Sequence, residues 1–230
     1  MTDKHISDIR FIRYPQPAIV SENNLNDRLL NASFDLTKLD GGCLWTKEEF
    51  IPPHLATLYL EELREQTAWI QPTIKMGAKV VKSPRLSAWY GDPEAVYTYS
   101  GLRNVPLPWT ETLSQLRNSL ENLTGIRFNS VLLNHYRSGS DSMGWHSDNE
   151  PELGYQPTIA SISLGDKRKF LMKHKKLACR WERILTHGSV LIMTGEIQRY
   201  WRHSVPKTKT FRGERINLTF RQILIAKKSG

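Results

Sequence analysis

Two histidines and one aspartate have the residue types and spacing of a metal site. His146 and Asp148 lie two residues apart in the string W-H-S-D, and His203 follows in W-R-H-S-V-P. On extended backbone, residues at i and i+2 point to the same face of a strand. Two imidazoles and one carboxylate are the ligand set of non-haem iron sites, which leave coordination positions open for other molecules. On this pattern alone, ordinary surface or core histidines remain an alternative.

A second polar pattern lies near the C-terminal end of the sequence. The string R-I-N-L-T-F-R places polar side chains on one face of a strand, at Arg215, Asn217, Thr219 and Arg221. Such a face either meets water or lines a cavity that binds an anion, because arginine is suited to gripping a carboxylate through two hydrogen bonds. Asn134 and Tyr136 form another i, i+2 polar pair. Together these side chains could hold a small dicarboxylate beside an iron ion.

Hydrophobic periodicity predicts the elements that must position these residues. Amphipathic patterns predict one helix over 53–68 and a second that is opened by Pro108 and Trp109 and closed by Gly125. After Gly125 the pattern changes to short apolar runs separated by turns with Gly or Pro. We expect strands over 128–136, 158–164, 169–172, 189–193, 200–204 and 215–225.

The order of these elements predicts a mainly β fold with flanking helices (α+β). Two helices followed by six strands favour helices packed on a β-sandwich or jelly roll, and the strands leave no room for the helices of a doubly wound sheet. Residues 1–45 are polar and lack long apolar runs. We expect them to form an irregular N-terminal extension with one short strand, ahead of a single domain over 46–230.

Composition excludes several classes of protein. A content of 39% hydrophobic and 24% charged residues is typical of globular proteins. No stretch approaches the ~18 apolar residues of a membrane span, and the first residues lack the apolar run of a secretory signal. With only Cys43 and Cys179, a disulfide framework is excluded and a reducing compartment is favoured. We expect a cytoplasmic protein, or a nuclear one in a eukaryotic cell.

The net charge of +9 is concentrated in the last third of the chain. Residues 151–230 contain 17 Lys and Arg against 5 Asp and Glu. A basic segment of this kind favours a polyanionic partner such as nucleic acid. A solvated basic face explains the charge equally well.

Five strings in order resemble a known family. They are L-N-H-Y-R-S-G-S-D-S-M-G-W-H-S-D-N-E (133–150), P-T-I-A-S-I-S-L-G, H-G-S-V-L-I-M, W-R-H-S-V-P and R-I-N-L-T-F-R-Q-I. Across roughly 45–228 the chain resembles the AlkB family of Fe(II)/2-oxoglutarate-dependent dioxygenases, most closely the eukaryotic-type DNA-repair members. The resemblance implies a double-stranded β-helix (jelly-roll) core, with iron(II), 2-oxoglutarate and O₂. It assigns His146, Asp148 and His203 to iron and assigns 2-oxoglutarate to Asn134, Tyr136, Arg215, Asn217 and Arg221.

The strings P-R-L-S-A-W-Y-G-D (84–92) and Y-T-Y-S-G (97–101) resemble the nucleotide-recognition lid of the family. We place this lid at about 74–101, with Met76 as a finger that fills the gap left by a flipped base; an aromatic hairpin packed on the sheet is the alternative. The resemblance implies substrate binding by Arg85, Tyr97, Tyr99, Ser100, Asn149 and Glu150. Tyr99 would stack on the base, and Glu150 would favour a cationic base. Close relatives have an acidic residue where this chain has Asn149, so the pocket lacks one negative charge.

Basic residues of 167–183 and 207–212 are expected to flank the mouth of the pocket. Phosphates would be contacted there by Lys169, Lys173, Lys175, Lys207, Lys209 and Arg212.

The resemblance implies DNA alkylation repair by a monomer. The substrates would be 1-methyladenine and 3-methylcytosine in single- or double-stranded DNA. The enzyme would oxidise the methyl group once the base is out of the helix, and formaldehyde and succinate would be released. Three alternatives stay open: an RNA demethylase of the same family, a repair enzyme that prefers etheno adducts, and a non-catalytic jelly roll that binds nucleic acid.

Overall fold

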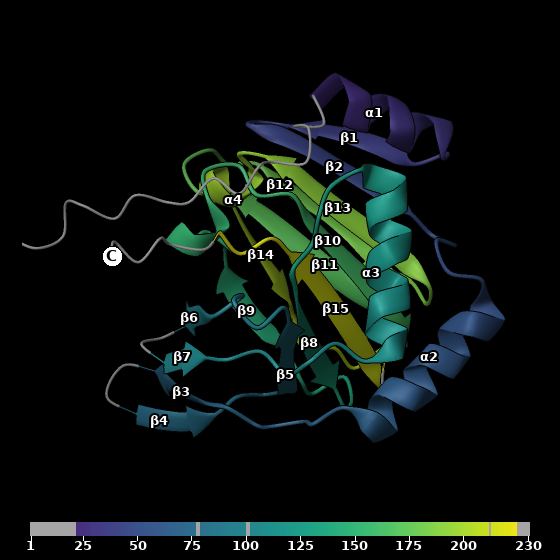
Figure 1. Ribbon diagram of the computed structural model, residues 1–230. Helices are drawn as coiled ribbons and strands as arrows, with labels where there is room; N and C mark the ends of the chain where they lie inside the picture. The colour runs from purple at the N-terminus through teal and green to yellow at the C-terminus, as the bar shows by residue number, and fades with distance from the viewer. Residues whose placement is uncertain (1–21, 77–78, 100–101, 212, 225–230) are drawn as a thin grey trace, which may run out of the picture.

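The computed structural model describes residues 22–76, 79–99, 102–211 and 213–224. Two antiparallel sheets form the body of the protein (Figure 1). The large sheet has, in spatial order, β1 (Asp35–Leu39), β2 (Gly42–Lys47), β13 (Ser189–Gly195), β10 (Ile159–Gly165), β15 (Arg215–Arg221), β8 (Ser130–Tyr136) and β5 (Leu86–Gly91). The small sheet has β12 (Arg180–Leu185), β11 (Arg168–His174), β14 (Trp201–Val205) and β9 (Met143–His146). The mainly β class is confirmed.

Three helices cover one face of the large sheet (Figure 1). They are α1 (Glu22–Asn31), α2 (Pro53–Gln66) and α3 (Glu111–Thr124). The helix α2 begins with a proline, whose missing N–H is not needed at that position. The helix α3 begins after Thr110, whose side chain accepts a hydrogen bond from Leu113 N, and ends at Gly125 with φ of 72°.

Each strand of the large sheet divides its side chains between two environments. On β15, Ile216, Leu218 and Phe220 pack under the helices in the larger hydrophobic cluster. The polar residues between them therefore point to the opposite side, toward the small sheet. On β13 both faces are apolar, and Leu191 and Met193 belong to a second cluster between the sheets. The space between the sheets thus receives both apolar and polar side chains.

Two short hairpins lie beside the small sheet and β5, at the lower left of Figure 1. They are β3 (Thr73–Met76) with β4 (Lys79–Lys82), and β6 (Tyr97–Tyr99) with β7 (Leu102–Asn104). They occupy the two ends of the segment expected to form a lid, whereas the middle of that segment is β5, a strand of the large sheet. The remaining short elements are a 3₁₀ turn at Pro151–Leu153 and the helix α4 (Ile197–Tyr200), which leads directly into β14.

Some local expectations are wrong. The second helix begins at Glu111 rather than at Pro108, because Thr110 supplies the cap. The strands β9 and β12 were not expected. The irregular structure expected over 1–45 is not found where the structure describes that segment: α1 packs on the core through Leu25 and Leu29, and β2 pairs with β13. A domain boundary at residue 45 stays a prediction. Among the described residues, no helix is long and apolar enough to cross a membrane.

Candidate active site

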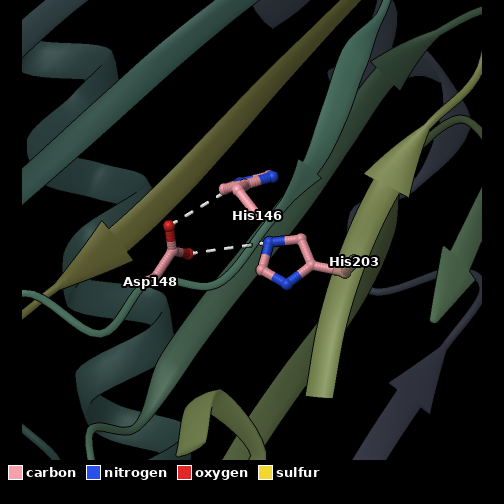
Figure 2. Close-up of side chains that lie close together, drawn as sticks. All are labelled: His146, Asp148 and His203. Atoms are coloured by element: carbon pink, nitrogen blue, oxygen red, sulfur yellow. Dashed lines mark ion pairs between the residues drawn. The ribbon is translucent and has the colours of Figure 1, made fainter. Parts of the chain in front are cut away.

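The three residues with metal-ligand spacing meet at the edge of the small sheet (Figure 2). His146 ends β9 and lies opposite His203 on β14. Asp148 follows β9 and faces both histidines: its Oδ1 is 3.8 Å from His146 Nε2, and its Oδ2 is 3.9 Å from His203 Nε2. The three ligand atoms lie within 4.8 Å of one another. They are close enough to contact one metal ion.

Hydrogen bonds and electrostatics prepare these side chains for a metal. His146 Nδ1 is 2.9 Å from the carbonyl of Gly144, so Nδ1–H donates there and the lone pair of Nε2 is available. Burial and the neighbouring His146 lower the pKa of His203 to about 3, so its imidazole is neutral. Burial alone would raise the pKa of Asp148, but Arg221 and both histidines hold it well below its usual range. Two neutral imidazoles and an ionised carboxylate are the forms that bind a metal.

A polar wall stands next to these three residues. The strands β8 and β15 are neighbours, with Asn134 opposite Asn217 and Tyr136 opposite Arg215. All four side chains are buried. Side chains from the next strands hold them: Ser161 Oγ accepts from Asn217 Nδ2 at 2.8 Å.

Arg215 is the member of this wall with unused hydrogen-bonding capacity. Its Nη2 donates to Ser163 Oγ at 2.9 Å, whereas Nε and Nη1 are buried without an acceptor among the described residues. Burial lowers its pKa to about 10, which leaves the group charged at neutral pH. The guanidinium also lies 5.3 Å from the centre of the Tyr136 ring, but no carboxylate pairs with it among the described residues. A buried cation without a negatively charged partner is costly, so this position fits an anionic ligand.

One cavity of about 360 Å³ joins the three metal-site residues to the polar wall. The cavity is lined by His146, Asp148 and His203 together with Asn134, Tyr136, Asn217 and Arg221. The cavity is also lined by Ile70, Pro72 and Thr73, just before the segment expected to form the lid, and by Arg85 within that segment. The cavity therefore joins the candidate metal ligands to polar side chains of β8 and β15 in one space.

A second hollow, of about 440 Å³, lies at the end of α3. Asp92, Arg117, Glu121 and Arg127 line it, and Arg117 pairs with Asp92 at 3.5 Å. It contains none of the predicted site residues. We therefore assign the chemistry to the first cavity.

Comparison with known proteins identifies the family. The 2OG-Fe(II) oxygenase superfamily matches residues 43–221. The chain is 37% identical, over 240 residues, to "Alpha-ketoglutarate-dependent dioxygenase alkB homolog 3" of Homo sapiens, covering 96% of this chain and 81% of that protein. The chain is a member of the AlkB family. It is also 42% identical, over 153 residues, to "DNA oxidative demethylase ALKBH2" of Homo sapiens, covering 63% of this chain and 59% of that protein.

A solved structure, "The structure of OsALKBH1", has the same fold, with a TM-score of 0.58 and 20% identity over 82% of this chain and all of that one. The jelly-roll fold is thereby confirmed. As an AlkB-family dioxygenase the protein uses Fe(II), 2-oxoglutarate and O₂. The residues present fit both groups: the donor set of His146, Asp148 and His203 suits iron, and the unpaired donors of Arg215 suit a carboxylate.

The predicted base-binding residues of this AlkB-family chain are only partly described. Arg85 is buried, and its Nε donates to Asn134 Oδ1 at 2.9 Å, so it supports the polar wall. Asn149 is exposed, whereas Oε2 of Glu150 is buried without a partner among the described residues. Ser100 lies outside the described residues, and so do the side chains of Tyr97 and Tyr99. The side chain of Met76 is outside them too.

The predicted phosphate-binding residues differ in their surroundings. Lys169 pairs with Glu182 at 3.0 Å, and Lys175 Nζ donates to the carbonyl of Gln198 at 2.8 Å. Lys173 Nζ lies 4.5 Å above the ring of Trp145. Lys207 and Lys209 are exposed, and Arg212 lies outside the described residues.

One residue of the first basic segment is not at the surface. Arg168 is 1% exposed and donates to the backbone carbonyls of Ser138, Asp141 and Pro206. It therefore cannot belong to a phosphate-binding surface at the pocket mouth.

Sequence reasoning missed the residues that support the site. Ser161 and Ser163, on β10, hold Asn217 and Arg215. Their i, i+2 spacing in A-S-I-S-L was a readable signal of a polar strand face. Gln198 accepts a hydrogen bond from the backbone N–H of Asp148 at 3.0 Å, although it lies 50 residues away in the chain. No local pattern could have indicated that contact.

Proposed function

We propose that this chain oxidatively demethylates N-alkylated bases in DNA, of the 1-methyladenine and 3-methylcytosine type. The observation that carries the proposal is the cavity in which the metal-site residues meet the polar side chains of β8 and β15. The relative named "DNA oxidative demethylase ALKBH2" supplies the class of substrate.

The cavity residues divide into two roles in this proposal. His146, Asp148 and His203 hold iron(II). Asn134, Tyr136, Asn217 and Arg221, which line the cavity, hold 2-oxoglutarate together with Arg215, which lies opposite Tyr136 on the neighbouring strand. Arg215 has two buried donors to offer a carboxylate. Arg221 Nη2 is 2.9 Å from Asp148 Oδ1, so it would orient the metal ligand as well as the cosubstrate. When bound, iron and 2-oxoglutarate supply the oxidation of the N-methyl group by O₂, with release of formaldehyde, succinate and CO₂.

The substrate base must leave the helix to enter this cavity. Methylation of the pairing edge weakens base pairing and so lowers the cost of flipping, which is a few kcal/mol for a paired base. These methylated bases are cationic, and Glu150 offers a carboxylate oxygen that has no partner among the described residues. In the proposal, Glu150 favours the cationic base, Tyr99 stacks on it, and Lys173, Lys207 and Lys209 contact the phosphates.

The test is a substrate panel with the full-length protein, Fe(II) and 2-oxoglutarate. Single- and double-stranded DNA and RNA oligonucleotides would each contain one 3-methylcytosine, and mass spectrometry would follow loss of the methyl group and formation of succinate. We expect demethylation of DNA with one succinate per methyl group removed, and none with Asp148→Ala. Faster demethylation of every RNA substrate would favour an RNA demethylase, and no turnover on any substrate would favour a binding module.

A further inference from the structure

The side chain of Gln198 joins the two segments that contain the metal-site residues. Gln198 belongs to α4, directly before β14, which contains His203. Its Oε1 accepts a hydrogen bond from the backbone N–H of Asp148 at 3.0 Å. The side chain is deeply placed, since the residue is only 2% exposed, and its Nε2 lies 3.3 Å from Met193 Sδ.

Asp148 needs such support because it lies outside the sheet. The strand β9 ends at His146, so the ladder between β9 and β14 does not extend to Asp148. The preceding residue is tied to the same region, because Ser147 Oγ donates to the carbonyl of Trp201 at 2.7 Å. Two consecutive residues after β9 are thus each bonded to the segment formed by α4 and the start of β14.

Gln198 is itself held in place. Lys175 Nζ donates to its backbone carbonyl at 2.8 Å, and the adjacent Ile197 is buried in the hydrophobic cluster between the sheets. The amide of Gln198 therefore presents its oxygen to Asp148 from a fixed backbone position.

We propose that Gln198 is a positioning residue for the iron site, which sets the place of Asp148 relative to His203. Its contact is with the backbone of Asp148, whereas Arg221 contacts the carboxylate. Partners that orient metal ligands typically change metal affinity by about 10- to 100-fold when they are removed. The inference concerns the iron site alone and does not depend on which base is the substrate.

The test measures binding of Co(II), added alone, to the full-length protein. Gln198→Met keeps the length of the side chain but removes the oxygen acceptor, and Gln198→Glu keeps an oxygen there. We expect Gln198→Met to raise the Kd for Co(II) by about 10- to 100-fold and to alter the Co(II) absorption spectrum. Gln198→Glu is expected to restore most of the affinity and the wild-type spectrum.

Asn129 offers a matched control for loss of a bond between an amide side chain and the backbone. Its Oδ1 accepts from the backbone N–H of Ile223 at 2.7 Å, and neither residue belongs to the metal site. We expect Asn129→Leu to lower Tm and to leave the Kd and spectrum of Co(II) unchanged. If Gln198→Met behaves like Asn129→Leu, with lower Tm and wild-type Co(II) binding, the proposal is wrong.

A second variant covers the case in which Gln198→Met does not fold. Lys175 is exposed, and Lys175→Met removes the hydrogen bond that holds the backbone of Gln198. We expect a smaller increase in the Kd for Co(II), with Tm close to wild type. Co(II) affinity and spectrum identical to wild type in this variant would overturn the proposal.

Discussion

Arg221 Nη2 lies 2.9 Å from Oδ1 of Asp148. Arg221 belongs to β15 in the large sheet, whereas Asp148 follows β9 in the small sheet, so the contact joins the two sheets at the cavity. Asp148 is 5% exposed, and burial of a carboxylate favours its neutral form. The guanidinium reverses that effect and keeps the pKa of Asp148 well below its usual range. The proposed cosubstrate strand therefore also maintains the charge of the metal site.

Loss of Arg221 should weaken metal binding as well as cosubstrate binding. In Arg221→Met the Asp148 carboxylate stays buried without its cation, which costs about 3–5 kcal/mol for a buried pair. We expect the Kd for Co(II) to rise by at least about tenfold and Tm to fall. Titration of Co(II) by absorbance and thermal unfolding measure the two effects.

Arg64 provides the control for Arg221. Its pair with Glu214, at 3.1 Å, is partly exposed, so Arg64→Met should change stability by less than about 1 kcal/mol. It should leave Co(II) binding unchanged. Wild-type Co(II) affinity in Arg221→Met would contradict the role given to Arg221.

Arg215 should matter for 2-oxoglutarate but not for folding. In Arg215→Met a buried cation with two unused donors is replaced by an apolar side chain of similar length. Replacing a buried ion pair by apolar groups is often neutral or stabilising by about 1–4 kcal/mol, and Arg215 is a buried charge that has no carboxylate partner among the described residues to leave behind. We expect Tm without ligand to stay the same or rise, and the increase in Tm on adding 2-oxoglutarate with Mn(II) to be lost.

Arg168 is the matched control for Arg215, because it is also buried but donates to three backbone carbonyls. Arg168→Met should lower stability by about 3 kcal/mol, since buried acceptors lose their donors. The increase in Tm with 2-oxoglutarate should persist. A large loss of Tm in Arg215→Met, equal to that in Arg168→Met, would show that Arg215 serves the fold instead.

The contrast between β15 and α4 shows what the sequence can predict. The polar face of β15 was readable because its other face packs under the helices, which imposes a strict alternation on neighbouring residues. The partner of Gln198 lies 50 residues away, and no periodicity reports such a contact. The burial of β12, at the edge of the small sheet, alternates along the strand, but its residue types do not follow it, because Ile184 is exposed and Arg183 is on the less exposed face.

The N-terminal segment shows the same limit at the level of whole elements. The sequence around Leu25 and Leu29 is too polar to predict a core helix, yet both side chains are buried against the helices and strands of the core. Trp45 is fully buried through the pairing of β2 with β13, a strand about 145 residues later in the chain. Burial of this kind depends on distant partners, which local composition does not contain.

Asp141 should give the protein a stability that depends on pH. Burial raises the pKa of Asp141, but the hydrogen bonds from Arg137 outweigh it, and the net shift is downward. A carboxyl group with a lowered pKa in the folded state stabilises above its unfolded pKa of about 3.9. That stability is lost as pH falls through the folded pKa.

We therefore expect Asp141→Asn to be less stable than wild type by about 1 kcal/mol at pH 7, a modest value because Arg137 is half-exposed. The difference should shrink as pH falls below about 4, as measured by urea unfolding at several pH values. Asp35→Asn removes a mostly exposed pair with Arg183 and should show little difference at any pH. A gap for Asp141→Asn that stays constant down to pH 3 would contradict the assignment.

Asn149 should reduce the preference for cationic bases in the proposed reaction. The side chain is exposed and directly follows Asp148. An added carboxylate at an exposed position contributes ~0.2–1 kcal/mol to binding of a cation. We expect Asn149→Asp to raise kcat/KM for 3-methylcytosine by up to about fivefold, and to leave kcat/KM for a neutral etheno adduct unchanged or lower.

Asn122→Asp is the control, because it adds the same charge at an exposed position on α3 and should change kcat/KM for neither substrate. Equal kcat/KM values for wild type and Asn149→Asp on both substrates would show that this position does not influence specificity.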